Sequence, residues 1–207
     1  MNPFSIHDFQ DRIPVSRETI ERLESYADLL AQWQSRINLG GPSTLDDLWR
    51  RHMLDSAQLY GRLPAGTKTV YDLGSGAGFP GMVLAILGVS DVHLVESQRR
   101  KCTFLRQVAQ ATATPVTVHQ DRIELLHGKI IAPVITARAL APLPRLLDLA
   151  APLLGKSGVC LFLKGREARQ ELTLSQEKWR MTAEAIPSIS HSEGVVLQIR
   201  DISAYHG

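Results

Sequence analysis

The sequence predicts an α/β fold: a mainly parallel sheet covered on both faces by helices, with an N-terminal helical extension and a C-terminal antiparallel hairpin. Short β-branched or apolar runs alternate with helical patterns between residues 69 and 165. Such alternation is typical of parallel strands joined by helices. Two helical patterns precede this region, and two strand patterns separated only by a turn follow it.

Length and composition favour one well-buried core. The chain has 207 residues, of which 44% are apolar and 21% charged. This length suits one main domain, which we expect at residues 63–207, preceded by the helical extension at residues 1–62. Cys102 and Cys160 both lie in apolar patterns, so we expect buried, reduced thiols and no metal cluster. A net charge of +2 does not by itself indicate nucleic-acid binding.

The first residues do not resemble an export signal. Asp8, Asp11 and Arg12 stand where a signal peptide needs a continuous apolar run, and no apolar stretch reaches the roughly eighteen residues of a membrane span. We therefore expect a cytoplasmic protein without a membrane partner.

Residues 16–37 predict an amphipathic helix, with Ser16 as its N-cap. Its apolar positions recur every three to four residues, at Ile20, Leu23, Ala27, Leu30, Trp33 and Ile37. Residues 38–42 end this helix. Thr44 and Asp47 then resemble a capping box that opens a second helix toward Tyr60. Because Trp33 lies on the apolar stripe, we expect it in the core rather than at a stacking site.

The sheet region follows in regular order. We expect parallel strands at residues 69–73, 92–96, 115–120, 133–139 and 159–165, and helices at 81–87, 101–111 and 143–154. Residues 165–178 are polar. Residues 180–189 and 194–202 then predict the antiparallel hairpin that closes one edge of the sheet.

A glycine-rich stretch, DLGSGAGFPG, follows the first predicted strand at residues 72–81. Glycines at a strand-to-helix turn let the backbone approach a ligand, and Pro80 suits the start of a helix. The spacing of Gly76, Gly78 and Gly81 matches the dinucleotide fingerprint, but the match alone is weak. Alternatively, Asp72 introduces the glycines and Glu96, at the next strand end, accepts ribose hydroxyls.

This stretch with its acidic strand end resembles motif I of class I S-adenosylmethionine-dependent methyltransferases, which have a Rossmann-like α/β fold. Five further segments are similar, in order and spacing, to the glucose-inhibited division protein B family of bacterial 16S ribosomal RNA guanine-N7 methyltransferases. They are WQSRINL (33–39), RRHMLDS (50–56), QDRIE (120–124), ITARAL (135–140) and FLKG (162–165). The resemblance covers almost the whole chain.

The resemblance implies methyl transfer from S-adenosylmethionine to N7 of one guanine in the 530-loop of 16S ribosomal RNA, within a 30S subunit or assembly intermediate, by a monomer. Matching the motifs assigns the methionine part of the cofactor to Gly74, Gly76, Gly78 and Phe79, its ribose to Glu96, and its adenine to Ile123 and Glu124. Arg138 would lie where cofactor and target base meet.

The chemistry needs little help from side chains. A sulfonium already activates the methyl group and N7 carries a free lone pair, so neither a metal nor an acid or base is required. We therefore expect Arg138 to act in positioning only. Candidate substrate contacts are Arg51, His52, Asp55, Arg100 and Lys164. His52 and Asp55 share a helix face, either as a structural pair or as part of an RNA pocket.

Three alternatives remain open at this point. The first is a class I methyltransferase acting on a small molecule, with a pocket covered by the first two helices. The second is a nicotinamide-dependent dehydrogenase that uses Gly76 to Gly81. The third is an RNA-binding module that kept the fold without catalysis. Measurements of methyl transfer and of cofactor binding separate them.

Overall fold

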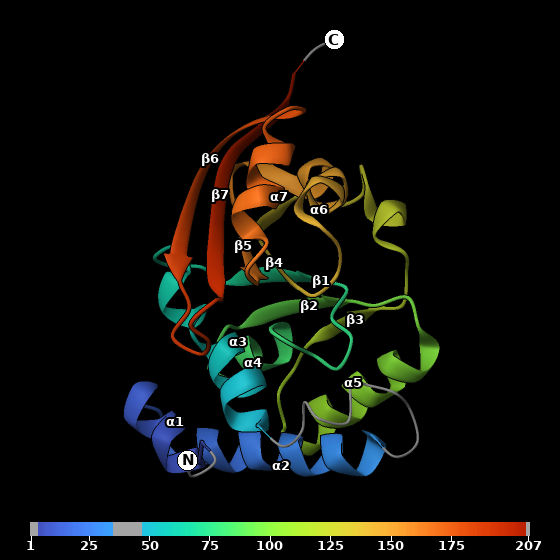
Figure 1. Ribbon diagram of the computed structural model, residues 1–207. Helices are drawn as coiled ribbons and strands as arrows, with labels where there is room; N and C mark the ends of the chain where they lie inside the picture. Colours follow the sequence, from blue (N-terminus) through green and yellow to red (C-terminus); the bar gives the residue numbers. More distant parts are fainter. Residues whose placement is uncertain (1–3, 35–46, 206–207) are drawn as a thin grey trace.

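A computed structural model describes residues 4–34 and 47–205, and its centre is a seven-stranded sheet with the strand order β3-β2-β1-β4-β5-β7-β6 (Figure 1). The strands are β1 Thr69–Leu73, β2 Asp91–Val95, β3 Thr117–His119, β4 Ala132–Arg138, β5 Leu154–Lys164, β6 Trp179–Pro187 and β7 Val195–Ala204. The first five run parallel, whereas β7 is antiparallel to both β5 and β6. The predicted mainly parallel sheet and its closing hairpin are confirmed.

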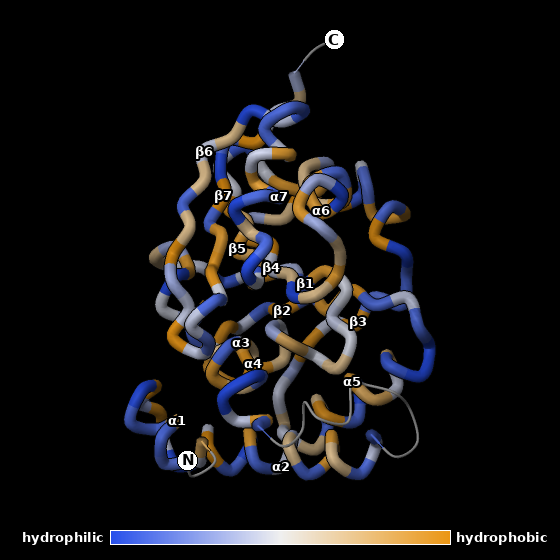
Figure 2. Tube along the Cα trace, viewed as in Figure 1, coloured by the Kyte–Doolittle hydropathy of each residue, from blue (hydrophilic) through white to orange (hydrophobic). Residues whose placement is uncertain are grey.

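Helices cover both faces of this sheet. Those on one face are α1 Ile6–Arg12, α2 Arg17–Gln34, α4 Gly81–Ile86 and α5 Arg99–Ala111, and those on the other are α6 Leu143–Ala150 and α7 Ala168–Ser175. Successive strand residues point to opposite faces of the sheet, so each face has its own hydrophobic cluster. Val70 packs with the first group of helices and Tyr71 with the second. Figure 2 shows hydrophobic and hydrophilic residues alternating along these helices and strands.

The connections change direction at β1, which lies between β2 and β4. From β1 the chain crosses outward to β2 and β3 through α4 and α5 on one face, returns to β4, and then crosses outward to β5 through α6 on the other face. In open α/β sheets, ligands bind beyond the carboxyl ends of the strands at such a switch point. A ligand site is therefore expected among the residues that follow β1, β2 and β4.

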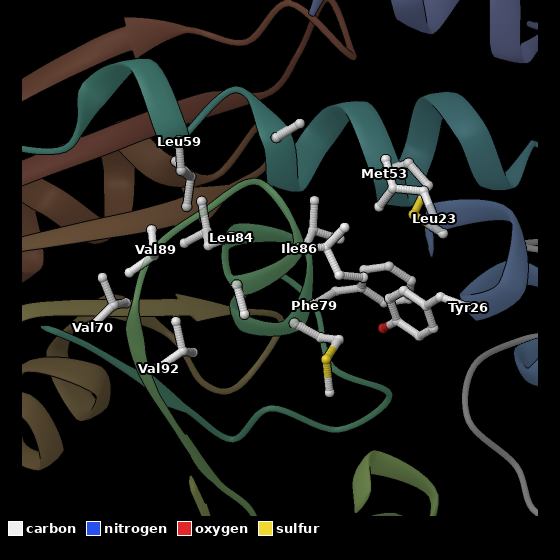
Figure 3. Packing of buried hydrophobic residues seen from close by; sticks show 14 of the residues in the cluster. Leu23, Tyr26, Met53, Leu59, Val70, Phe79, Leu84, Ile86, Val89 and Val92 are labelled. Atoms are coloured by element: carbon white, nitrogen blue, oxygen red, sulfur yellow. The ribbon is translucent and has the colours of Figure 1, made fainter. Parts of the chain in front are cut away.

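The N-terminal helices belong to the same core as the sheet. Phe9, Leu23 and Tyr26 are fully buried in one cluster with Val70 and Phe79. Figure 3 shows the Tyr26 ring beside Phe79. Ser16 caps α2 as predicted, because its Oγ accepts a hydrogen bond from the Thr19 N–H at 3.2 Å. The sequence predicts Trp33 in the core, but it is only partly buried and packs against the edge of the cluster.

Several elements differ from the sequence prediction. The second N-terminal helix is not one α-helix: Trp49–Leu54 is wound as a π-helix, α3 Asp55–Ala57 continues it, and a 3₁₀ turn follows at Tyr60–Arg62. The polar stretch 165–178 contains α7. Further 3₁₀ turns lie at Ile123–Leu126 and Ala151–Leu153. The second replaces the end of the helix predicted at 143–154, and β5 begins at Leu154 rather than at residue 159. Ile37, Thr44 and the stop at 38–42 lie outside the described residues. None of the described helices has the length and apolar character to cross a membrane.

Candidate functional site

The glycine loop joins β1 to α4 at the switch point. Gly76 has a φ of +57°, and a Cβ there would meet nothing closer than the Gly74 carbonyl oxygen at 3.7 Å. Gly78 differs, because its Cβ would lie 2.6 Å from the Tyr26 hydroxyl. The first glycine leaves room for a ligand, whereas the second leaves room for the protein's own core.

A cavity of about 370 Å³ opens beside this loop, and we call it the loop cavity. That volume lies within the range of small-molecule sites. Its walls come from the ends of β1, β2 and β4, from the segment after β3, and from α2: Leu30, Gln34, His52, Gly74, Ser75, Gly76, Ala77, Phe79, Val95, Glu96, Ser97, Gln98, Lys101, Asp121, Ile123, Arg138, Ala139 and Leu140. The N-terminal extension thus forms part of the wall.

Glu96 follows β2 and is only 7% exposed. Backbone donors hold both of its carboxylate oxygens: Oε2 accepts from the Gly76 N–H at 3.1 Å and Oε1 from the Gln98 N–H at 2.7 Å. A carboxylate has about four acceptor positions, so capacity remains for a ligand's hydroxyl groups. The loop and the second strand end are thereby fixed relative to each other.

Phe79 lies just before the start of α4, at the centre of a group of stacked side chains. The Tyr26 and His52 rings stack on it with centroids 5.2 Å and 4.9 Å away, and the Arg138 guanidinium carbon lies 4.9 Å from its centroid. The Tyr26 hydroxyl also donates a hydrogen bond to the Ala77 carbonyl oxygen. Aromatic and cation–π contacts of this kind fix ring orientations. Tyr26 of α2 therefore holds the glycine loop in place through its contacts with Phe79 and Ala77.

Arg138 ends β4 and is held by the π-helix. Its Nη1 donates to the Arg51 carbonyl oxygen at 2.9 Å, and its Nη2 donates to His52 Nδ1 at 2.6 Å. Asp55 Oδ2 lies 3.6 Å from Nη1. Burial lowers the pKa of Arg138, and the Asp55 carboxylate opposes that shift. Because His52 Nδ1 is an acceptor here, that nitrogen is not available as a base.

A second cavity, of about 450 Å³, lies on the other side of Arg138, and we call it the outer cavity. It is lined by Arg51, His52, Asp55, Arg138, Ala139, Leu163, Lys164, Gly165, Ser190, His191 and Gly194. His52, Arg138 and Ala139 line both cavities, so these three residues form a partition between them. Lys164 reaches its wall from the end of β5, where its Nζ pairs with Glu171 Oε2 at 2.6 Å.

Asp72 lies beneath the loop and is fully buried. Thr136 Oγ1 donates to its Oδ1 at 2.8 Å across the β1–β4 pair. Burial raises the pKa of Asp72 to about 6, although the hydrogen bond from Thr136 opposes this shift. Asp72 lines neither cavity, so it supports the loop from below.

Most predicted site residues lie together. The loop cavity takes in Gly74, Gly76, Phe79, Glu96, Ile123 and Arg138, and the outer cavity takes in Arg51, His52, Asp55 and Lys164. Three do not join either wall: Gly78, Glu124 and Arg100. Gly78 packs under Tyr26, Glu124 points to Arg145 at 2.6 Å, and Arg100 is exposed at the start of α5.

Sequence reasoning missed several lining residues. Asp121 precedes Ile123 in the segment after β3, whereas the prediction chose Glu124. Ser97, Gln98 and Lys101 follow β2 in the same wall. Their position directly after strand ends is the signal that was available, because those ends converge on one edge of a parallel sheet.

Neither thiol belongs to the site. Cys102 and Cys160 are both buried and free, and burial raises the pKa of each. A raised pKa keeps a thiol protonated and unreactive, as the sequence predicted. Within residues 4–34 and 47–205, no group of three or more His, Cys, Asp or Glu side chains is arranged to hold a metal ion.

The chain resembles known proteins in sequence and structure. The sequence model described as rRNA small subunit methyltransferase G (GidB) matches residues 19–199. Ribosomal RNA small subunit methyltransferase G of Paramagnetospirillum magneticum is 59% identical over 189 residues, which are 91% of this chain and 92% of that protein.

Solved structures share the architecture at low sequence identity. A TehB-like SAM-dependent methyltransferase from Corynebacterium glutamicum aligns with a TM-score of 0.56 and 15% identity, over 86% of this chain and 98% of that one. A MtNAS variant in complex with S-adenosylmethionine aligns with a TM-score of 0.58 and 14% identity, over 95% of this chain and 83% of that one. The predicted class I methyltransferase fold is confirmed, and the chain belongs to the rRNA small subunit methyltransferase G family.

Proposed function

We propose that this protein transfers a methyl group from S-adenosylmethionine to N7 of one guanine in the 530-loop of 16S ribosomal RNA. One observation carries the proposal: a cofactor-sized cavity at the glycine loop and a cationic outer cavity share the partition of His52, Arg138 and Ala139. Methyl transfer requires the methyl group of the cofactor to lie next to N7 of the base, and two adjoining cavities suit that arrangement.

The loop cavity suits S-adenosylmethionine. The Glu96 carboxylate is placed to accept the ribose hydroxyls, Ile123 offers an apolar surface to the adenine, and Gly76 leaves space beside the loop. The sulfonium supplies an already activated methyl group. Asp121 and Gln98 add polar groups to the same wall.

The protein's own contribution is alignment. N7 of guanine has a free lone pair, so no side chain has to remove a proton before the methyl group is transferred. The structure agrees with this requirement, because His52 Nδ1 is engaged by Arg138 and both thiols are buried. Arg138, held by the Arg51 carbonyl oxygen and His52, is suited to orient the base or the cofactor carboxylate.

The substrate is 16S ribosomal RNA within a 30S subunit or an assembly intermediate, and the protein acts as a cytoplasmic monomer. Arg51 and Lys164 place positive charge at the outer cavity, whereas Arg100 is exposed at the start of α5 and lines neither cavity. These few cations suit a target whose shape is already set by a ribosomal particle, since charge alone would bind RNA weakly.

Transfer of a radiolabelled methyl group tests the proposal. The protein is incubated with S-adenosylmethionine and, in turn, 30S subunits, 70S ribosomes, free 16S RNA and a small-molecule pool, all from cells that lack it. We expect label at N7 of one guanine in the 530-loop. Label in a small molecule, or cofactor binding without label in any RNA, would refute the assignment. Binding of a nicotinamide cofactor instead would indicate a dehydrogenase.

A further inference from the structure

We propose that Asp55 selects guanine in the outer cavity: with Arg138 it presents an acceptor beside a donor, which matches N1–H and O6 of guanine. This inference rests on the proposed function, since it assumes that the outer cavity receives the acceptor base. It adds a specificity-determining residue to that reaction.

The carboxylate is rigidly placed by one of its oxygens. Asp55 Oδ1 accepts from the Ser190 hydroxyl at 2.5 Å and from Gln58 Nε2 at 2.9 Å. Gln58 in turn accepts from the Ile189 N–H through Oε1 and bonds Ser188 Oγ through Nε2. The turn between β6 and β7 therefore fixes Asp55 in its rotamer.

The other oxygen is free to take a ligand. Asp55 Oδ2 forms an ion pair with Arg138 Nη1 at 3.6 Å, a distance too long for a hydrogen bond, and accepts no hydrogen bond within the part of the chain that the structure describes. Both side chains line the outer cavity and keep 19% and 18% of their surface exposed. A carboxylate oxygen and a guanidinium N–H thus stand side by side at the cavity wall.

This pair distinguishes the purine bases that carry an acceptor at N7. Guanine presents O6, an acceptor, next to N1–H, a donor. Adenine presents the reverse, an amino group next to the unprotonated N1. A carboxylate only accepts and an arginine only donates. Guanine therefore satisfies both Asp55 and Arg138, whereas adenine places its N1 lone pair against the carboxylate.

The test exchanges both the base and Asp55. Small subunits are reconstituted with guanosine, inosine or adenosine at the methylated position, and kcat/KM for N7 methylation is measured for each. Inosine keeps O6 and N1–H, so we expect it to react within about fivefold of guanosine. Adenosine should react at least about 100-fold more slowly, as expected when a charged hydrogen bond is lost and a buried acceptor is opposed.

Asp55→Asn replaces the Oδ2 acceptor by an amide nitrogen, which only donates, while the remaining oxygen keeps the bonds from Ser190 and Gln58. We expect slower methylation of guanosine and a guanosine-to-adenosine ratio at least tenfold smaller than that of the wild type. Asp148→Asn, which alters an ion pair with Lys178 outside both cavities, should leave the ratio unchanged. S-adenosylmethionine affinity reports whether each variant is folded.

Three results would overturn the inference: inosine rejected as strongly as adenosine, adenosine accepted by the wild type, or an unchanged ratio in folded Asp55→Asn. If Asp55→Asn does not fold, Ser190→Ala releases the same carboxylate and should also reduce the ratio. A wild-type protein that methylates none of the guanosine particles would instead contradict the proposed function.

Discussion

Gly76 and Gly78 of the loop lie two residues apart in the sequence but have different surroundings. Gly76 faces the loop cavity, whereas Gly78, at a φ of +101°, lies under the fully buried Tyr26. Because Tyr26 is fixed by its hydrogen bond to Ala77 and its stack on Phe79, it has no room to withdraw. The same residue type therefore protects a ligand space at one position and a core contact at the other.

Alanine at these positions should separate stability from cofactor binding. Gly78→Ala combines a positive φ with a clash at 2.6 Å and should lower the free energy of unfolding by about 2–4 kcal/mol. Gly76→Ala carries only the backbone strain, about 1–2 kcal/mol, but should weaken S-adenosylmethionine binding more. Urea denaturation and calorimetric titration measure the two effects. Equal destabilisation by both variants would contradict this division.

Glu96 and Glu124 form a matched pair for testing the loop cavity. Glu96→Gln should weaken S-adenosylmethionine binding by about 10- to 100-fold, because a charge-assisted hydrogen bond to the ribose is lost. Glu124→Gln should leave the affinity unchanged, because that carboxylate pairs with Arg145 outside the cavity. Titration calorimetry on both variants compares them. A comparable loss in Glu124→Gln would show that Glu124 contacts the adenine after all.

At the scale of elements, α7 ties the end of β5 to the start of α6. Glu171 of α7 pairs with Lys164 at 2.6 Å, and its Oε2 also accepts from the Leu143 N–H at 2.6 Å. The Lys164 and Glu171 side chains are 10% and 16% exposed. This helix therefore holds the lysine that faces the outer cavity.

Removing one partner of that pair should destabilise the protein. Glu171→Ala leaves Lys164 charged and largely buried, so we expect a loss of about 3 kcal/mol in urea denaturation. Adding Lys164→Met should recover part of this loss. Asp148→Ala, which breaks the more exposed pair with Lys178, should cost below about 1 kcal/mol. Similar losses in the two single variants would indicate that the Lys164 pair is screened like a surface pair.

Sequence patterns predicted the elements whose signal is local. The strand at 69–73, the amphipathic helix from Ser16 and the glycine loop all follow from short-range periodicity or composition. The π-helix does not, and the Arg138 side chain that contacts it at the Arg51 carbonyl oxygen and at His52 comes from a strand more than 80 residues further along the chain. Similarly, α7 has a polar sequence, and its place depends on the contact between Glu171 and Lys164. Long-range contacts of this kind leave no periodic trace.

At the scale of the whole molecule, the two apolar clusters meet at the sheet, and Asp72 lies fully buried in β1, between β2 and β4. Residues of the N-terminal extension share the first cluster with β1 and α4. The division of the chain at residues 62 and 63 stays a prediction. The buried carboxyl gives the stability of the whole fold a defined pH dependence.

Stability should fall as the pH rises from about 4 to about 6. The pKa of Asp72 is raised to about 6 in the fold, so this carboxyl ionises first in the unfolded chain, which is stabilised relative to the fold over this range. The loss from this group amounts to about 3 kcal/mol and levels off above pH 6. Asp72→Asn, which retains an acceptor for Thr136, should flatten the curve. Urea denaturation from pH 4 to pH 8 measures both proteins, and parallel curves would exclude Asp72 as the source.

The partition between the cavities has a thermodynamic consequence. In the proposed reaction the cofactor and the base would face His52, Arg138 and Ala139 from opposite sides, so a movement that one ligand imposes on these residues would alter the affinity for the other. Linkage makes this effect reciprocal and equal in size for both ligands. The proposed methyl transfer would move one positive charge from the loop cavity to the outer cavity. The free energy that couples the two cavities would therefore differ between the bound substrates and the bound products.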